Sequence, residues 1–376
     1  MKHQETLVVG GVDAHADSHH AAALDERGAL LGSEAFATTR DGYGELFRWL
    51  SSFGGLAVVG VESTGCYAAG LVRYLRSRGV RVLEVNEPHA HARRRVGKSD
   101  PIDAELAARA ALAGKADAIP KRTDGIVESI RQLRVARQSA VKARSAAMVQ
   151  LRDLIVTAPE ALREQLSEPQ TIRGKAGLCR RLRPAAGELE RPSQSARFAL
   201  RSLARRIQTL DEEIAALDEQ LERLVRSAAP RTTALLGIST GHAGQLLVSA
   251  GQNIERLHGE GSFAALCGAS PIPASSGKTT RHRLNYGGDR DANRALHLIA
   301  VCRLRYCPRT RAYAERRTAE GKTKPEIIRC LKRYIARETY NTLTADLTSL
   351  HRQQRPSHVT TIICGAGPTG ITRHRT

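Results

Sequence analysis

The chain has 376 residues, enough for two domains with hydrophobic cores, and its 58 Lys and Arg against 38 Asp and Glu give a formal net charge of +20. This charge favours a polyanionic partner, because each phosphate that a basic side chain neutralises releases counterions, although a solvated basic surface has the same composition. Aromatic residues make up only 4% of the chain, which argues against recognition dominated by base stacking. We therefore expect a nucleic-acid partner bound mainly through its phosphates.

The cysteines and the N-terminal sequence indicate the cellular compartment in which the protein is expected. The seven cysteines are scattered and contain no C-x-x-C pair, which excludes a disulfide framework and a zinc ribbon. The N-terminus is polar and no apolar run is long enough to span a bilayer. We expect a cytoplasmic protein without a membrane segment.

Residues 1–120 have the pattern of an α/β domain. Three apolar strands joined by short turns predict an antiparallel meander, at residues 6–12, 19–24 and 29–38. Helices and strands then alternate: a helix capped by Asp41, a buried strand at 56–61, a helix at 65–78, a strand at 80–85 and a helix from about Asp100 to Gly114. This order resembles the ribonuclease H fold.

Residues 121–229 predict a helical connector. A helix is expected at 126–156, and residues 157–197, which contain several prolines and glycines, are expected to form an irregular insert. A heptad repeat then runs through Leu203, Ile207, Leu210, Ile214, Leu217, Leu221 and Leu224. The 126–156 helix or a second chain would complete a coiled coil, and the alternative is a helix packed within its own domain.

A second domain is expected at 230–348. Residues 235–238 and a helix at 242–250 resemble a helix-hairpin-helix element, whose helix start contacts phosphates through backbone amides. A short helix at 262–267 and a loop at 268–284 follow, with longer helices at 289–306 and 325–343. Residues 349–376 are expected to form a flexible basic tail.

Four acidic residues form the first candidate site. Asp13 and Glu62 each end an apolar strand, and Asp100 and Asp103 lie on one face of a helix start. The structural alternative is that Asp100 is an N-cap before Pro101 and that Asp103 complements the helix dipole. Convergent carboxylates repel one another unless cations neutralise them, so together they predict divalent metal, with Mg²⁺ suited to phosphodiester chemistry.

A basic serine loop at 271–283 is the second candidate site. Ser276 could act as a nucleophile, with Lys278, Arg281 and Arg283 compensating the charge on a phosphate, although an ordinary turn has the same composition. The Gly277–Thr279 tripeptide lacks the spacing of a nucleotide-binding loop. Histidines near Asp13 and at His89 and His91 could bind metal, but surface positions are favoured because no third ligand lies at a suitable spacing.

These motifs together resemble a known family. Val-Gly-Gly-Val-Asp13-Ala-His, Val-Gly-Val-Glu62-Ser-Thr-Gly, Lys-Ser-Asp100-Pro-Ile-Asp103-Ala and Phe263 to Lys278 are similar to the DEDD transposases of the IS110 insertion-sequence family, in the same order along residues 6–345. The resemblance implies a RuvC-like, ribonuclease H-fold N-terminal domain, a coiled-coil connector and a helical C-terminal transposase domain. Lys278 replaces a glycine that is frequent in the family.

The resemblance also implies a mechanism. It assigns Mg²⁺ to Asp13, Glu62, Asp100 and Asp103, and DNA strand cleavage and exchange to Ser276, with Ser275 less favoured. It further implies double-stranded donor and target DNA, a bridge RNA as guide, and homodimers that assemble into homotetramers in which one subunit's carboxylates meet another's serine. The alternatives are a RuvC-like structure-selective nuclease without a covalent intermediate, a non-catalytic nucleic-acid-binding protein and, more weakly, an actin-like ATPase.

Overall fold

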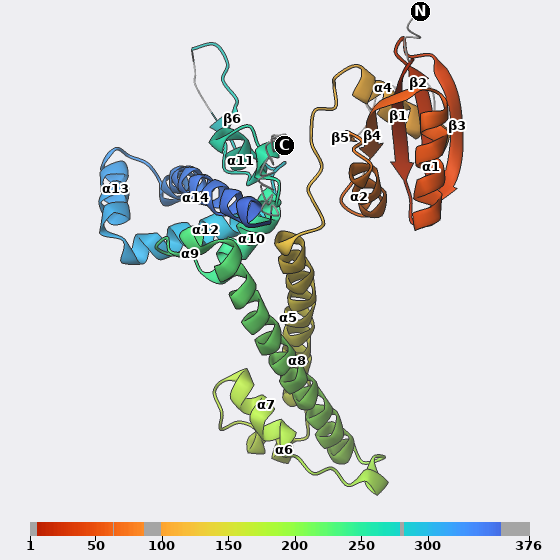
Figure 1. The fold of residues 1–376 in the computed structure, drawn as a ribbon. Helices are drawn as coiled ribbons and strands as arrows, with labels where there is room; N and C mark the ends of the chain where they lie inside the picture. Colours follow the sequence, from red (N-terminus) through yellow and green to blue (C-terminus); the bar gives the residue numbers. More distant parts are fainter. Residues whose placement is uncertain (1–5, 63, 86–98, 279–281, 355–376) are drawn as a thin grey trace, which may run out of the picture.

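A five-stranded mixed sheet forms the N-terminal domain of the computed structural model, which describes residues 6–62, 64–85, 99–278 and 282–354. The strands are β1 (Leu7–Ala14), β2 (Ser18–Asp25), β3 (Leu30–Ala37), β4 (Gly55–Glu62) and β5 (Val82–Val85), in the order β3-β2-β1-β4-β5. Short turns make β1, β2 and β3 antiparallel, whereas β4 and β5 run parallel to β1. This arrangement confirms the predicted ribonuclease H-like domain (Figure 1).

Helices cover both faces of this sheet. On one face, α1 (Arg40–Ser52) and α2 (Ala69–Ser77) pack against the core that includes Val12 and Leu50. On the other face lies α4 (Asp100–Leu112), whose alanines pack on Val9, Leu83 and Val85. Two predicted details are wrong: Thr39 rather than Asp41 caps α1, and the helix expected at 65–78 begins only at Ala69.

The connector is an antiparallel helix pair. Helix α5 (Ile126–Thr157) packs along α8 (Pro192–Ala228), and Arg137 and Arg144 form ion pairs with Asp218 and Asp211 respectively. These two pairs show that the helices run in opposite directions. Helix α5 of the same chain is therefore the coiled-coil partner of α8 (Figure 1). Within the heptad, Ile207, Ile214 and Leu221 are buried, whereas the alternate leucines are only half-buried.

The insert at 157–197 is not irregular, which corrects the sequence expectation. It contains α6 (Glu160–Gln165), α7 (Ile172–Arg180), the 3₁₀ helix η1 (Ala186–Glu188) and the start of α8. Leu162, Leu166 and Cys179 pack with Leu200 of α8 in a separate small core. The prolines lie at helix starts and between helices, whereas glycines such as Gly174 and Gly177 are accommodated within α7.

The C-terminal region is mostly helical. Its elements are α9 (Pro230–Thr233), α10 (Thr240–Ala250), η2 (Ile254–Arg256), α11 (Glu260–Leu266), β6 (Ile272–Pro273), β7 (His282–Arg283), α12 (Arg290–Tyr306), α13 (Pro308–Ala319) and α14 (Lys324–Gln354). Helix α13 and the β6–β7 hairpin were not predicted, and α14 extends into the expected tail, whose residues from 355 lie outside the described chain.

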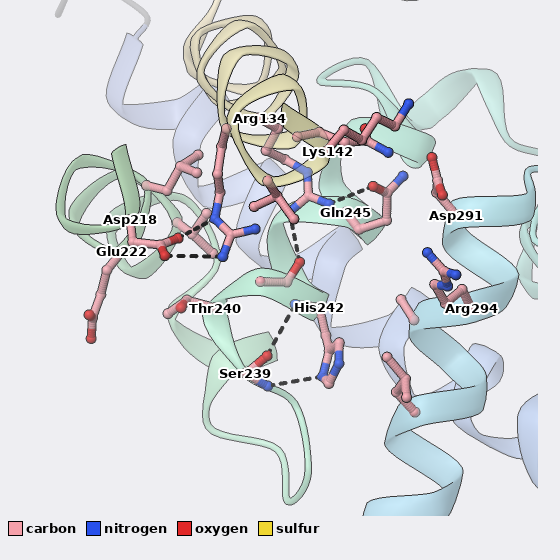
Figure 2. Close-up of a pocket in the computed structure, with 18 residues that line it drawn as sticks. Arg134, Lys142, Asp218, Glu222, Ser239, Thr240, His242, Gln245, Asp291 and Arg294 are labelled. Atoms are coloured by element: carbon pink, nitrogen blue, oxygen red, sulfur yellow. Dashed lines mark hydrogen bonds and ion pairs between the residues drawn. The ribbon is translucent and has the colours of Figure 1, made fainter. Parts of the chain in front are cut away.

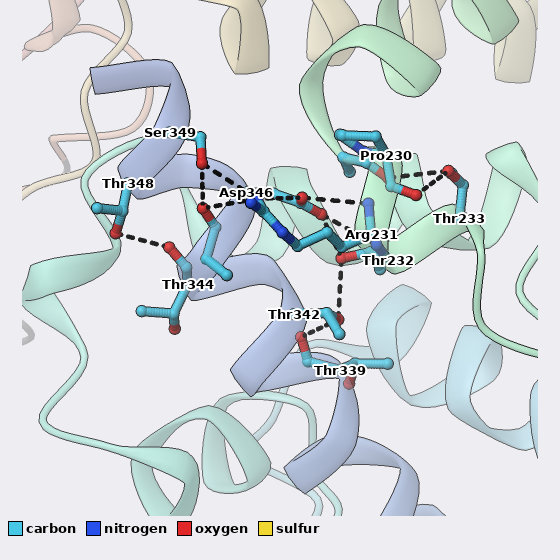
Figure 3. A network of polar contacts seen from close by, with 12 residues as sticks. Pro230, Arg231, Thr232, Thr233, Thr339, Thr342, Thr344, Asp346, Thr348 and Ser349 are labelled. Carbon is cyan, nitrogen blue, oxygen red and sulfur yellow. Dashed lines mark hydrogen bonds and ion pairs between the residues drawn. The ribbon is translucent and has the colours of Figure 1, made fainter. Parts of the chain in front are cut away.

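A buried carboxylate joins two helices of this region. Asp346 of α14 accepts hydrogen bonds from the backbone N–H of Arg231 at 3.2 Å and of Thr232 at 3.0 Å, and from the Thr232 hydroxyl at 2.9 Å (Figure 3). Asp346 therefore caps the N-terminus of α9 from more than 100 residues away.

No helix in the described part of the chain is long and apolar enough to cross a membrane.

The segment that follows α4 contacts both the sheet domain and the helical region. Ala118 bridges to Glu84 of β5, and the carbonyl of Pro120 accepts hydrogen bonds from Arg76 of α2 at 3.1 Å and from Asn253 at 3.0 Å. Lys121 is largely buried and donates to the carbonyl of Val248 at 3.1 Å. Side-chain and backbone hydrogen bonds thus hold this short connection on both sides.

Candidate active site

Two glycines allow α4 to approach the sheet closely. Gly11 of β1 and Gly60 of β4 are register partners on neighbouring strands. A Cβ at Gly11 would lie 2.1 Å from the carbonyl oxygen of Ala104, and one at Gly60 would lie 2.6 Å from that of Ala107. Only glycine fits at these positions, because any side chain would displace the helix backbone.

This close packing places the predicted acids at one edge of the sheet. Side chains alternate along a strand, so Asp13 and Glu62, each two residues beyond a docking glycine, share the face that α4 covers. The N-terminal turn of α4 carries Asp100 and Asp103 to the same edge. Asp103 is 2% exposed, whereas the side chain of Asp100 is 57% exposed and open to solvent.

The helix start differs by one residue from the prediction. Ser99 is the N-cap, Asp100 is the first helical residue and Pro101 the second, and the backbone N–H of Asp103 donates to the carbonyl of Ser99 at 2.9 Å. The carboxylate of Asp100 therefore does not cap the helix. Lys98 and the preceding arginine run lie outside the described residues.

His15 joins two of the acids, although the sequence favoured it as a surface residue. Its Nδ1 atom lies 3.7 Å from Oδ2 of Asp13, and its Nε2 atom lies 3.9 Å from Oδ1 of Asp100. One ligand atom from each of these three residues lies within 4.8 Å of the other two. The Asp-x-His spacing at a strand end was the available signal, but the third ligand comes from a helix 85 residues further along the chain.

The donor set of this site fits a divalent cation. Carboxylate oxygens are the preferred ligands of Mg²⁺ and Mn²⁺, and an imidazole nitrogen is also accepted by Mn²⁺ and later transition metals. Asp13 and Asp100 could contribute directly with His15, while Glu62 and Asp103 lie on the adjoining strand and in the same helical turn. His89 and His91 lie outside the described residues.

The serine loop forms a hairpin. Ile272 and Pro273 pair with Arg283 and His282, and Ser276 lies exposed beyond β6, next to Gly277 with a φ of +56°. Such a φ suits glycine, which explains the Ser-Gly pair at the turn. Ser275, Lys278 and Arg283 are also exposed, whereas Arg281 lies outside the described residues.

The base of the hairpin is held tightly. A Cβ at Gly288 would lie 2.3 Å from the backbone nitrogen of Gly268, so the two ends of the loop cross at close range. Asp289 then caps α12 by accepting from the N–H groups of Asp291 and Ala292, and the hydroxyl of Ser249 donates to it at 2.6 Å. The exposed turn with Ser276 therefore projects from a fixed base.

One chain does not bring the serine to the acids. The β6–β7 hairpin projects from the helical C-terminal region, and the sheet domain lies apart from it, connected through the segment that precedes α5 (Figure 1). The two predicted halves of the chemistry therefore belong to separate parts of the molecule.

The start of α10 lines a cavity of about 680 Å³ between α5, α8 and α12 (Figure 2). Gly237 has a φ of +80° and Ser239 caps the helix, as a helix-hairpin-helix element requires. However, Arg134 points at this helix, donating to the carbonyl of Gly241 at 2.9 Å and to Gln245 at 2.6 Å. Both acidic and basic side chains line the cavity, so it is a polar joint between helices. The phosphate contact expected of this element stays a prediction.

Comparison with known families supports the assignment of both halves. Residues 10–158 match the DEDD transposase model of the IS110 family, and residues 231–315 match the model described as transposase IS116/IS110/IS902 family. No curated protein matches the chain. The first match contains the four acids and the second contains the serine hairpin, in the order that the structure shows. The chain therefore belongs to the IS110 family of insertion-sequence transposases, which are enzymes that act on DNA.

Proposed function

We propose that this transposase cleaves and exchanges DNA strands with Ser276 as nucleophile and with a Mg²⁺ site formed by Asp13, Glu62, Asp100 and Asp103. The observation that carries the proposal is the docking of α4 on Gly11 and Gly60, which directs acids from three elements to one edge. When bound there, Mg²⁺ would stabilise negative charge on the oxygens of a reacting phosphodiester. His15 adds a nitrogen donor, so Mn²⁺ would be accepted as well.

The serine half has the properties that a nucleophile needs. Ser276 is exposed on a hairpin turn, where its Oγ can reach a phosphorus atom. Attack by the Ser276 hydroxyl forms a serine–phosphate bond and releases the hydroxyl proton. The bond to one deoxyribose oxygen breaks, and that oxygen takes up a proton and leaves as a hydroxyl. Lys278 and Arg283 would compensate the charge on the phosphate, and Arg281 is assigned the same role from the sequence.

A complete site would then be built from two chains. The separation of Ser276 from the acids within one chain supports this arrangement (Figure 1). We extend the proposal to homodimers that pair into a tetramer and to a bridge RNA that selects donor and target DNA, as the family resemblance implies. The net charge of +20 is suited to holding both nucleic acids.

Trapping of a covalent protein–DNA adduct tests the nucleophile. Full-length protein is incubated with labelled donor DNA and Mg²⁺, and the mixture is resolved on a denaturing gel. We expect the adduct with the wild-type protein and with Ser275→Ala, and its complete loss with Ser276→Ala while DNA binding is retained. An adduct that persists in Ser276→Ala would overturn the serine assignment.

The same experiment distinguishes the serine mechanism from the main alternative. A RuvC-like nuclease that uses only the carboxylates would release hydrolysed DNA without an adduct, and Ser276→Ala would cut as well as the wild-type protein. In both cases Asp13→Asn should abolish cleavage, because it removes a carboxylate from the centre of the acid cluster.

A further inference from the structure

A groove of about 940 Å³ lies in the C-terminal region, away from the serine hairpin. Its walls come from the end of α12, from α13 and from α14, with Leu236 at one side. Helix α13 begins directly after Cys307 and packs against both α12 and α14. The groove is therefore built on helices with a fixed mutual arrangement.

Two tyrosines meet in this groove. The rings of Tyr313 and Tyr334 lie 5.7 Å apart at an interplanar angle of 83°, so the edge of one faces the other. Tyr334 is 56% exposed although its neighbours Ile335 and Leu331 are buried. The chain has few aromatic residues, and Tyr43, Trp49 and Phe263 pack in cores or against them. Other aromatic side chains, such as Phe198 and Tyr286, are also exposed, and Tyr334 is the exposed ring that lines this groove.

Guanidinium groups surround the tyrosines. Arg316 and Arg317 lie over the ring of Tyr313, at 5.5 and 5.9 Å from its centroid. Arg309 is exposed, and among the described residues no acidic side chain forms an ion pair with it. Arg316 forms a long ion pair with Glu320, at 3.9 Å, and its side chain is 67% exposed. Arg309 and the weakly paired Arg316 can therefore both contact a negatively charged ligand.

The acidic side chain in the groove is already neutralised. Glu338 forms an ion pair with Arg303 at 2.5 Å, and Arg337 is engaged by Glu260, which lies outside the groove. The charge that remains uncompensated is positive. Aromatic rings beside exposed guanidinium groups are suited to a ligand that alternates flat apolar groups with phosphates.

We propose that this groove binds an unpaired DNA strand, with a base stacked on Tyr334 and the flanking phosphates held by Arg309 and Arg316. A duplex does not offer a base face to a side chain, because its bases are stacked on one another, whereas a cleaved and exchanging strand does. The family implies a DNA substrate, and the strand cleavage and exchange proposed above would supply the unpaired strand, so this inference rests on that proposed function. The proposal is independent of whether Ser276 is the nucleophile.

Fluorescence of a single-stranded oligodeoxynucleotide that contains 2-aminopurine tests the stacking. Full-length protein should quench the probe, and Tyr334→Ala should abolish the quenching and weaken binding by about 5- to 100-fold, the value of one base–aromatic stack. Tyr334→Phe keeps the ring and should retain both. Tyr334→Leu repeats the test with an apolar side chain of similar bulk, in case the alanine variant folds poorly. Phe198→Ala on α8 removes another exposed ring, 51% exposed, and should change neither.

The salt dependence and the choice of nucleic acid complete the test. Arg309→Ala and Arg316→Ala should each lower the slope of log K against log salt by about 0.7 for the single strand. Duplex DNA of the same sequence should bind Tyr334→Ala as it binds the wild-type protein. Equal losses for duplex and single strand, an unchanged Kd for the single strand, or a loss confined to an oligoribonucleotide would each overturn the proposal.

Discussion

At the scale of single residues, Gly11 decides whether the acid site can form. Gly11→Ala would place a methyl group 2.1 Å from a carbonyl oxygen of α4 and 2.2 Å from the backbone nitrogen of Ala108. We expect the helix to shift, with a loss of about 1–3 kcal/mol in the free energy of unfolding and weaker Mn²⁺ binding as Asp100 moves away from Asp13. Urea unfolding and isothermal titration with Mn²⁺ measure the two effects.

Gly177→Ala is the matched control for that substitution. Gly177 lies within α7, and a Cβ there would meet no atom within 4 Å. Alanine should stabilise this helix by up to about 1 kcal/mol and leave Mn²⁺ binding unchanged. Equal stability of Gly11→Ala and the wild-type protein would contradict the close docking of α4.

His19 is buried and should make stability depend on pH. It stacks on Tyr43 with ring centroids 5.6 Å apart, and burial, helped by the charge of His15, lowers the pKa of His19 below its ordinary value of 6.5. The unfolded chain then binds more protons than the folded one, so the free energy of unfolding should fall as the pH drops below 6.5, by at most about 1.4 kcal/mol per pH unit.

Replacement of this ring by phenylalanine isolates its contribution. His19→Phe keeps an aromatic ring beside Tyr43 but cannot be protonated, so its stability should fall less between pH 6.5 and 5 than that of the wild-type protein. Urea unfolding at several pH values gives the difference in the free energy of unfolding between the two proteins. Burial also lowers the pKa of His242, but His242 is present in both proteins, so its contribution cancels. Parallel curves would show that His19 does not titrate in this range.

At the scale of elements, α9 depends on a carboxylate from α14. Helix α9 has four residues, too few to be stable alone, and the N–H groups of its first turn donate to Asp346 (Figure 3). Asp346→Ala should cost about 1–3 kcal/mol in the free energy of unfolding, because it leaves buried donors without an acceptor.

Thr348→Ala provides the comparison for this prediction. The Thr348 hydroxyl is exposed and donates only to a carbonyl of its own helix, that of Thr344, at 2.7 Å. Its loss should change stability by less than about 0.5 kcal/mol. Similar thermal denaturation midpoints for the two variants would show that the cap of α9 contributes little.

At the scale of the whole molecule, the separation of acids and serine predicts complementation between chains. Asp13→Asn and Ser276→Ala should each be inactive alone. In a mixed oligomer, the intact acids of one chain can meet the intact serine of another, so mixing and re-equilibrating the two proteins should restore strand exchange. Adduct formation on labelled DNA measures this. A mixture as inactive as its components would show that each chain uses its own acids and serine.

Much of the architecture follows from local patterns in the sequence. Alternating and continuous apolar runs predicted all five strands of the main sheet, and the heptad repeat predicted a coiled-coil partner, because these patterns reflect which face of each element is buried. Helix α13 was missed because its sequence, Pro308–Ala319, is strongly basic and has little apolar periodicity. Helices α6 and α7 were missed because the prolines and glycines in and around them suggested an irregular segment.

Local patterns in the chain specify the residue types of the candidate site: four acids at element ends, and a serine beside a glycine in a basic loop. Which of these residues meet depends on how the helices pack against the sheet. Asp13, His15 and Asp100 come together because two glycines, unremarkable in sequence, let a helix lie against the sheet. Ser276 stays apart because its hairpin belongs to the helical C-terminal region, whereas the acids belong to the sheet domain (Figure 1). The spacing of residues along the sequence does not give the distances between these side chains, because those distances depend on how elements far apart in the chain pack together.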